Sequence, residues 1–515
     1  MLASVCVGLL VTPLIIRELG TSTYGLWILV LAIIGYFPVF DLGFRRALIH
    51  DTAVRRGTSR EPEIGESVSS FFVLFCLLGV VILFATLLLA YVMPHLFKIP
   101  DDQLGTARFM LIVVGATWAL QFPSNAPVAV LLGYDRYDGV NALDTLCRVA
   151  EAIATAIVLL SGGGVESLAI ILASVELPKA VARFLLAYAF VPGFQISLRK
   201  VDWRYLRHSG KRSVTFFINT SNSLLNARAD ELMIGAFLAV SSVGVYGVAL
   251  RLVNMSRNFA LQLNEVLIPT TSKLTNVRGG QQELATMMIK ATRVTAGLVT
   301  GITLAFIVFG QPFLHLWVGP ELEDSYYPLV VLSITTYFAM VYDLPSKVVL
   351  ASDRHNLAAV LTLGSMAGNI ALSVALIQRF ELIGVAIGTL VPLSLTGSMK
   401  MVLGCRLAQL SSWTFLRSAV LPSLAPAIPA GLFGVLLQEL KSADNWLVLL
   451  AESAAVMLLY GVPFVLFNFR LSQVRHLLRE VVRVTVRPRG PYAAATTVAF
   501  SDGRPDEAKP EPNLP

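Results

Sequence analysis

Long apolar runs recur along this chain from its first residues to about residue 468. A helix needs roughly 20 mostly apolar residues to cross about 30 Å of hydrocarbon. The lengths of the runs, and their lack of alternation with a period of two, predict membrane helices and not strands of a barrel. The fourteen expected spans are 2–16, 23–42, 69–93, 107–132, 140–161, 167–192, 213–237, 242–269, 287–309, 326–350, 357–378, 382–407, 417–437 and 445–468.

The composition excludes a large soluble domain. Of 515 residues, 55% are hydrophobic and 14% are charged, whereas soluble domains carry roughly 25% charged residues. The four cysteines are scattered without metal-ligand spacing, so we expect no metal and no other cofactor. The net charge of +7 is concentrated in particular connections, which does not indicate a nucleic-acid partner. The sequence therefore predicts an all-α polytopic membrane protein.

Lysine and arginine are distributed unequally between the connections. The connection between spans six and seven alone carries Arg199, Lys200, Arg204, Arg207, Lys211 and Arg212, and the other even-numbered connections are also basic. The odd-numbered connections hold only Arg17, Lys98, Arg379 and Lys441. The positive-inside rule then predicts that both termini are cytoplasmic. No basic residue precedes the short first run, so we expect a slightly clipped first helix and not a signal peptide.

Two pairs of segments recur at nearly one offset. "PVAVLLGYDR" (127–136) matches "PSKVVLASDR" (345–354) at an offset of 218, and "LGTSTYGLW" (19–27) matches "LAVSSVGVY" (238–246) at 219. These matches predict two parallel six-helix repeats, related by an axis along the membrane normal, plus two C-terminal helices. The expected domains are an N-lobe (1–192), a basic cytoplasmic linker (193–212), a C-lobe (213–408), two added helices (409–469) and a partly disordered cytoplasmic tail (470–515).

Two segments resemble a known family. "RELGTSTYGLWILVLAIIGYFPVFDLGF" (17–44) and "ARADELMIGAFLAVSSVGVYGVALRL" (227–252) are similar to the first and fourth hairpins of Wzx-like polysaccharide flippases. These belong to the multidrug, oligosaccharidyl-lipid and polysaccharide exporter superfamily. The resemblance implies two lobes, alternating access, and transfer of undecaprenyl-diphosphate-linked oligosaccharides across the bacterial inner membrane. It also implies membrane lipids, a polysaccharide polymerase and a chain-length regulator as partners, and a central cavity in which basic residues handle the anionic substrate.

Charged and amide side chains inside the spans form regular stripes. In span eight, Arg251, Asn254, Asn258, Gln262 and Glu265 follow each other by three or four residues, which places them on one helix face. A charge at mid-bilayer costs about 2.5–3.5 kcal/mol, so these groups need a polar lining or mutual pairing. Basic residues outnumber acidic ones, and guanidinium groups suit a diphosphate. The predicted substrate cavity consists of Arg17, Arg148, Arg183, Arg251, Asn254, Asn258, Gln262, Asn219, Asn226 and Lys347.

The acidic residues allow two interpretations. Asp230, Glu231, Glu265 and Asp343 are candidates for coupling to protons or sodium ions. Local ion pairs are the alternative for Asp343 with Lys347, and likewise for Asp144 with Arg148, since both pairs have i,i+4 spacing. The role of Arg228 stays open. We assign the aromatic residues near the ends of the spans mainly to the interfacial aromatic belt, with stacking of one or two of them on sugar rings as the alternative. They are Tyr24, Trp27, Tyr36, Trp203, Tyr246, Trp317, Tyr326 and Tyr327.

Two other functions remain to be weighed. A multidrug and toxic compound extruder would share the fold, but twelve spans and an acidic cavity are expected of it. A membrane glycosyltransferase or an O-antigen ligase would need a sizeable extracytoplasmic loop, and every odd-numbered connection here is short. The sequence thus favours a flippase without enzymatic activity.

Overall fold

The computed structural model describes residues 2–58, 64–207, 209–210, 228–265, 280–352, 354–440 and 445–468. The elements in these residues are all helical, which confirms the predicted fold class. Eight helical stretches among them are long and apolar enough to span a membrane by length and hydropathy alone. Charged residues inside α7, α8 and α11 lower the hydropathy of these helices, although they coincide with predicted spans five, six and eight.

We refer to the helices in the first half of the chain as the N-lobe. Its helices are α1 (Leu2–Leu19), α2 (Thr21–Ile34), α3 (Phe44–Arg55), α4 (Ile64–Leu96), α5 (Leu104–Gln121), α6 (Asn125–Gly133), α7 (Tyr137–Leu160) and α8 (Val165–Phe190), with short 3₁₀ turns at Phe37–Asp41, Asp101–Gln103, Phe122–Ser124 and Leu198–Lys200.

The second half forms the C-lobe and the added helices. The C-lobe comprises α10 (Ala229–Phe237), α11 (Val240–Glu265), α13 (Gln281–Val318), a 3₁₀ turn (Pro320–Ser325), α14 (Tyr326–Ala351) and α15 (His355–Leu407). The added segment consists of α16 (Ser412–Phe415), a π-helix (Leu416–Val420), α17 (Leu421–Leu424), α18 (Ala427–Leu440) and α19 (Trp446–Asn468).

The second predicted span is not one continuous helix. Helix α2 ends at Ile34, and Pro38 lies in the short 3₁₀ turn that follows. Leu42 and Gly43 then have φ values of 49° and 79° before α3 begins. Because proline has no N–H and left-handed residues interrupt a helix, the predicted span 23–42 is regular only in its first part.

Predicted spans eleven and twelve are the two halves of α15. They meet at Glu381, whose φ of 48° breaks the helix between them. Such a short reversal keeps both halves antiparallel neighbours within the C-lobe.

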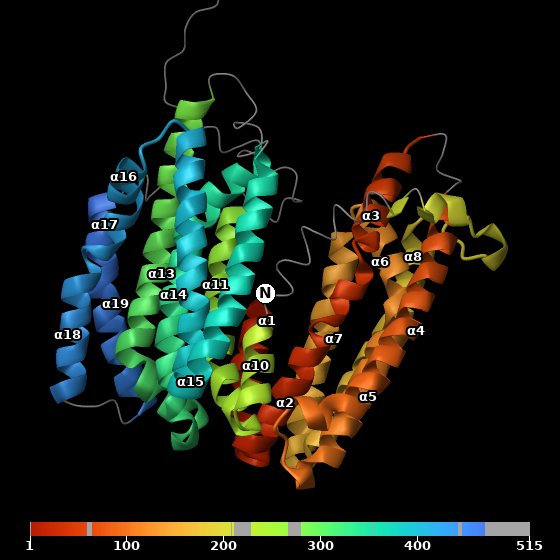
Figure 1. The fold of residues 1–515 in the computed structure, drawn as a ribbon, viewed down its shortest axis with the longest axis horizontal. Coiled ribbons are helices and arrows are strands. Elements are labelled where there is room, and N and C mark those ends of the chain that lie inside the picture. Colours follow the sequence, from red (N-terminus) through yellow and green to blue (C-terminus); the bar gives the residue numbers. More distant parts are fainter. Residues whose placement is uncertain are drawn as a thin grey trace, which may run out of the picture.

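The two lobes touch near the odd-numbered connections and diverge toward the even-numbered ones, which lie at the top of the view (Figure 1). At the contact, a Cβ atom on Gly25 of α2 would lie 2.1 Å from the Val240 carbonyl oxygen, and one on Gly244 of α11 would lie 3.0 Å from the Thr21 carbonyl oxygen. Thr21 and Val240, like Gly25 and Gly244, differ by 219 in number. The contact is therefore reciprocal, as parallel repeats around an axis along the membrane normal require.

Part of the linker between the lobes is bound to the N-lobe. The backbone N–H of Asp202 donates to Ser70 Oγ at 2.9 Å, and that of Ser197 donates to Ser69 Oγ at 3.0 Å. Tyr205 donates its hydroxyl proton to Asp51 on α3. Because both serines are fully buried in α4, residues 195–207 follow the N-lobe and not the C-lobe.

Candidate functional site

Arg251 lies where the lobes approach each other in the interior of the molecule. It is half-buried on α11, and a Cβ atom on Gly8 of α1 would lie 3.0 Å from its Nη2 atom. The charge of Arg251 also acts on the buried Tyr24 of α2. Helix α1 packs against α7 on its other side. Arg251 therefore faces the N-lobe helices α1 and α2 from the C-lobe.

The predicted polar stripe of α11 is present on one continuous helix. Asn254 is half-buried, and Asn258, Gln262 and Glu265 are exposed. None of these four side chains has a hydrogen-bond partner among the described residues, which leaves their polar groups available. The stripe thus has the accessibility that contact with a polar ligand needs.

Sequence reasoning missed Asn264, which is next to that stripe. Asn264 is 1% exposed and donates to Asp343 Oδ2 at 2.8 Å, while Thr295 donates to its Oδ1 atom at 2.8 Å. Lys347 forms the predicted i,i+4 ion pair with Asp343 at 2.9 Å. Arg257, one of the basic residues inside the predicted spans, also interacts electrostatically with Asp343. Asp343 is therefore part of a network that joins α11, α13 and α14.

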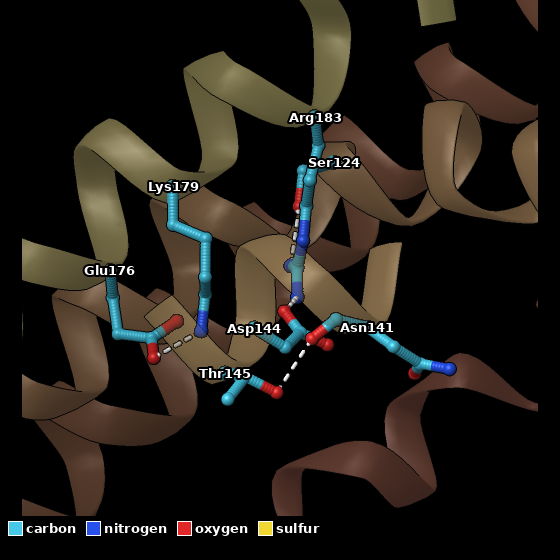
Figure 2. Close-up of polar contacts among 7 residues, drawn as sticks. All are labelled: Ser124, Asn141, Asp144, Thr145, Glu176, Lys179 and Arg183. Atoms are coloured by element: carbon cyan, nitrogen blue, oxygen red, sulfur yellow. Dashed lines mark hydrogen bonds and ion pairs between the residues drawn. The ribbon is translucent and has the colours of Figure 1, made fainter. Parts of the chain in front are cut away.

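A second charged cluster connects α7 and α8 in the N-lobe (Figure 2). Arg183 Nη2 lies 3.0 Å from Asp144 Oδ1, and Arg183 Nη1 donates to Ser124 Oγ at 3.2 Å. The i,i+4 spacing offered Arg148 as an alternative partner of Asp144. The observed pair with Arg183 corrects this expectation, because the packing of α8 on α7 brings residues 39 positions apart into contact.

The rest of this cluster lies about one turn away. Lys179 and Glu176 form an ion pair on α8, and both side chains point toward α7 in Figure 2. Arg148 is exposed on α7, and its charge acts on Glu151. The Nε atom of Arg183 is buried without an acceptor among the described residues. The cluster therefore binds two helices together and still contains an unsatisfied guanidinium donor.

Asp230 is buried inside the C-lobe and does not lie on an open face. Its Oδ2 atom accepts hydrogen bonds from the Tyr246 hydroxyl at 2.6 Å and the Thr389 hydroxyl at 3.0 Å, and Asn369 also interacts with it. Ser373 donates to Asn369 at 3.0 Å. The Asp230 carboxylate on α10 is thus surrounded by neutral oxygen-bearing groups from α11 and both halves of α15.

Arg228 and Glu231 form a pair of their own. Arg228 Nη1 lies 3.0 Å from Glu231 Oε1, and the Glu231 side chain is only 1% exposed. Arg228 also packs against Gly35 in the N-lobe, since a Cβ atom there would lie 3.2 Å from its Nε atom. Arg228 therefore neutralises a buried acid and contacts the opposite lobe.

The structure corrects the assignment of four aromatic residues to the interfacial belt, and it describes only one of the three remaining predicted cavity residues. Tyr24 and Tyr246 are fully buried, and Trp27 and Trp317 are 7% and 6% exposed, so these aromatic side chains belong to the protein core and not to an interfacial belt. Arg17 is exposed in the last turn of α1. Asn219 and Asn226 lie outside the described residues.

Comparison with known proteins gives consistent results. The family described as polysaccharide biosynthesis protein matches residues 14–326. The chain is 21% identical to the uncharacterized membrane protein EpsK of Bacillus subtilis over 473 residues, which cover 90% of this chain and 92% of EpsK. It is 23% identical to a probable low-salt glycan biosynthesis flippase, Agl15, of Haloferax volcanii, with 72% and 74% covered. It is 20% identical to a putative O-antigen transporter of Shigella flexneri, with 72% and 87% covered.

Solved structures share the fold. The lipid II flippase MurJ in an inward closed conformation has a TM-score of 0.70 at 16% identity and covers 90% of this chain and 96% of its own. An inward-facing multidrug resistance transporter of the MATE family has a TM-score of 0.66 at 15% identity, with 79% and 94% covered. At these identities the likeness concerns the fold alone.

Proposed function

Because this chain belongs to the polysaccharide biosynthesis protein family, we propose that it is a flippase for lipid-linked oligosaccharides. Its substrate is an undecaprenyl-diphosphate-linked oligosaccharide, which it moves across the bacterial inner membrane for O-antigen or exopolysaccharide synthesis. The names of two relatives, a probable glycan flippase and a putative O-antigen transporter, support this substrate class. A polymerase and a chain-length regulator are the expected protein partners.

The position of Arg251 is the observation that carries this proposal. Among the described residues, no ion pair includes Arg251, and the polar stripe Asn254–Asn258–Gln262 continues from it along α11. A guanidinium group grips phosphate oxygens through two parallel hydrogen bonds. In the proposal, Arg251 holds the diphosphate, and the amides that follow it bind sugar hydroxyls.

The arrangement of the lobes supports alternating access. They are in contact near the odd-numbered connections and diverge toward the basic even-numbered ones (Figure 1). If the basic connections are cytoplasmic, this is the arrangement that receives substrate from the cytoplasmic side. Transport then requires the Gly25–Gly244 contact to separate while the opposite ends of the lobes approach.

Asp230 is our leading candidate for ion coupling. Burying an ionisable group inside a membrane protein costs free energy, so such a group marks a candidate binding or transport site. The hydroxyl and amide groups around Asp230 supply oxygen atoms suited to a sodium ion or a proton relay. Glu231 and Asp343 already neutralise cations, and Glu265 is exposed at the end of α11. These three are therefore weaker candidates.

A multidrug extruder is the alternative with the same fold, supported by the likeness to the MATE transporter. The basic residues at the lobe junction argue against it, because a cationic drug is repelled by Arg251. We also propose that the chain carries out no covalent chemistry. A drug-susceptibility assay in a host without its own pumps separates the extruder from the flippase, since only the extruder would confer resistance.

Export of surface polysaccharide by an Arg251→Ala variant tests the proposal. We expect surface glycan to be lost while the variant is inserted in the membrane at the wild-type level. Arg379→Ala is the matched control, because this substitution removes the same charge at the reversal of α15, where Arg379 lies over the ring of Phe380. Wild-type surface glycan in the Arg251→Ala strain would exclude the phosphate-binding role.

A further inference from the structure

A groove separates the two halves of α15 near the end of the C-lobe where this helix begins and ends. Its volume is about 380 Å³, and it is shallow and open along one side. All lining side chains except one serine are apolar. They are Leu357, Leu361, Ser398, Met399, Val402 and Leu403.

The groove opens toward the bilayer and not toward another helix. Leu357 and Met399 are 41% and 44% exposed, and the neighbouring Val360 and Leu395 are more exposed still. In a membrane protein, apolar side chains of this exposure contact hydrocarbon chains. The occupant therefore enters sideways from one leaflet.

Two arginines flank the membrane-surface end of the groove. Arg354 precedes Leu357 by three residues at the start of α15, and Arg406 follows Leu403 by three residues at its end. Arg406 shares a helix face with Leu403, and Arg354 is the N-cap residue of α15, so both arginines lie at the end of the groove. Both are exposed, and no ion pair among the described residues includes either. Asp353, beside Arg354 in the sequence, lies outside the described residues.

The walls of the groove are fixed relative to each other. Lys400 Nζ donates to Thr362 Oγ1 at 2.7 Å and so connects the two halves of α15 at the depth of the lining residues. Farther along, Ser373 donates to the carbonyl oxygen of Val385. These hydrogen bonds connect the two halves of α15 along the groove and beyond it.

From these features we infer that the groove binds an anionic glycerophospholipid, with one acyl chain between the halves of α15 and the phosphate between Arg354 and Arg406. Guanidinium groups bind phosphate in a bidentate manner, and basic residues at the cytoplasmic surface attract anionic lipids. The groove lies on the bilayer side of the C-lobe, apart from the lobe junction at Gly8 and Arg251, so this inference does not rest on the proposed transport function.

Native mass spectrometry of the full chain in detergent tests the site by titration with phosphatidylglycerol. We expect saturable binding to the wild type, and binding roughly tenfold weaker in the double variant Arg354→Gln/Arg406→Gln. Leu361→Trp fills the groove and should also weaken binding while both arginines remain. The matched control is Arg379→Gln, an arginine of the same helix at the opposite membrane face, which should bind like the wild type.

Two further probes identify the occupant. Phosphatidylcholine with the same acyl chains should bind the wild type weakly. Its affinity should be no higher than that of phosphatidylglycerol for the double variant. Equal binding of both lipids, or unchanged phosphatidylglycerol binding in the double variant, would overturn the site. Undecaprenyl phosphate is the second probe. If it binds the wild type more tightly than phosphatidylglycerol does, and the double arginine variant abolishes this binding, the groove belongs to a polyprenyl lipid and the phospholipid assignment is overturned.

Discussion

Gly25 and Gly244, which are 219 residues apart, touch each other across the lobe junction. A Cβ atom on either glycine would lie 3.1 Å from the backbone nitrogen of the other. The same offset relates the two sequence segments in which they lie, so the contact joins equivalent positions of the two repeats. The repeat axis passes close to this pair.

Gly25→Ala should shift the lobes away from the observed contact. The added methyl group would meet the carbonyl oxygen of Val240 at 2.1 Å, a backbone atom that cannot move aside cheaply. We expect greater labelling of a cysteine introduced at Val240 by a membrane-impermeant reagent from outside, and lower polysaccharide export. Gly105→Ala is the control, because a Cβ atom there meets nothing within 4 Å. Unchanged labelling would contradict a close lobe contact at Gly25.

The Arg183–Asp144 pair should show measurable coupling. Single Arg183→Ala and Asp144→Ala variants and their double variant give the coupling free energy from unfolding in denaturant. Because the Asp144 side chain is 39% exposed, we expect the lower part of the range for contacting residues, about 0.5–1 kcal/mol. As a control, we expect the free-energy changes to be additive in a double-mutant cycle of Arg183 with Asp138, which is exposed at the start of α7. Additivity in the Asp144 cycle would mean that the ion pair does not contribute to stability.

Asp230→Asn should uncouple transport from an ion gradient. The asparagine oxygen still accepts hydrogen bonds from Tyr246 and Thr389, so the fold is expected to persist without the negative charge. In proteoliposomes, an imposed sodium or proton gradient should no longer accelerate movement of a lipid-linked oligosaccharide. Asp138→Asn is the charge-matched control. If the gradient still accelerates transport by Asp230→Asn, the coupling site lies elsewhere.

Tyr205→Phe should loosen the linker from the N-lobe. The lost hydrogen bond to Asp51 involves a charged acceptor, but Arg55 and Ser67 still contact that carboxylate. We expect a loss of about 1 kcal/mol in local stability, seen as roughly fivefold faster amide hydrogen exchange in residues 195–207. Tyr137→Phe removes an exposed hydroxyl and should leave exchange unchanged. Equal exchange in both variants would show that Tyr205 does not hold the linker.

The hydrogen bond between Tyr205 and Asp51 should be insensitive to pH in the physiological range. Burial and the hydrogen bond to Asp51 raise the pKa of Tyr205 to about 12. A folded-state pKa above the unfolded value of about 10 means that the stabilisation is fully present below pH 10 and is lost as the pH rises through 12. Protection of residues 195–207, corrected for intrinsic exchange rates, should therefore be constant between pH 6 and 9. A decline within that interval would argue against a buried phenol at this contact.

The sequence by itself determined the helical membrane fold, the approximate positions of most spans and the offset between the repeats. Its i,i+4 spacing also offered the Asp343–Lys347 ion pair as one of two interpretations, and this pair is present. These features depend on local properties: apolar length sets a span, and residues four apart on one helix are neighbours whatever surrounds them.

Only the tertiary structure decided which distant residues meet. Arg183 reaches Asp144 because α8 packs on α7, and Tyr246 covers Asp230 because α10, α11 and α15 converge there. Tyr24 and Tyr246 looked interfacial from their positions near the ends of spans, but the packing of one lobe on the other buries them. A helical periodicity defines the face of a side chain, and the crossing of helices, which no single segment encodes, determines what that face contacts.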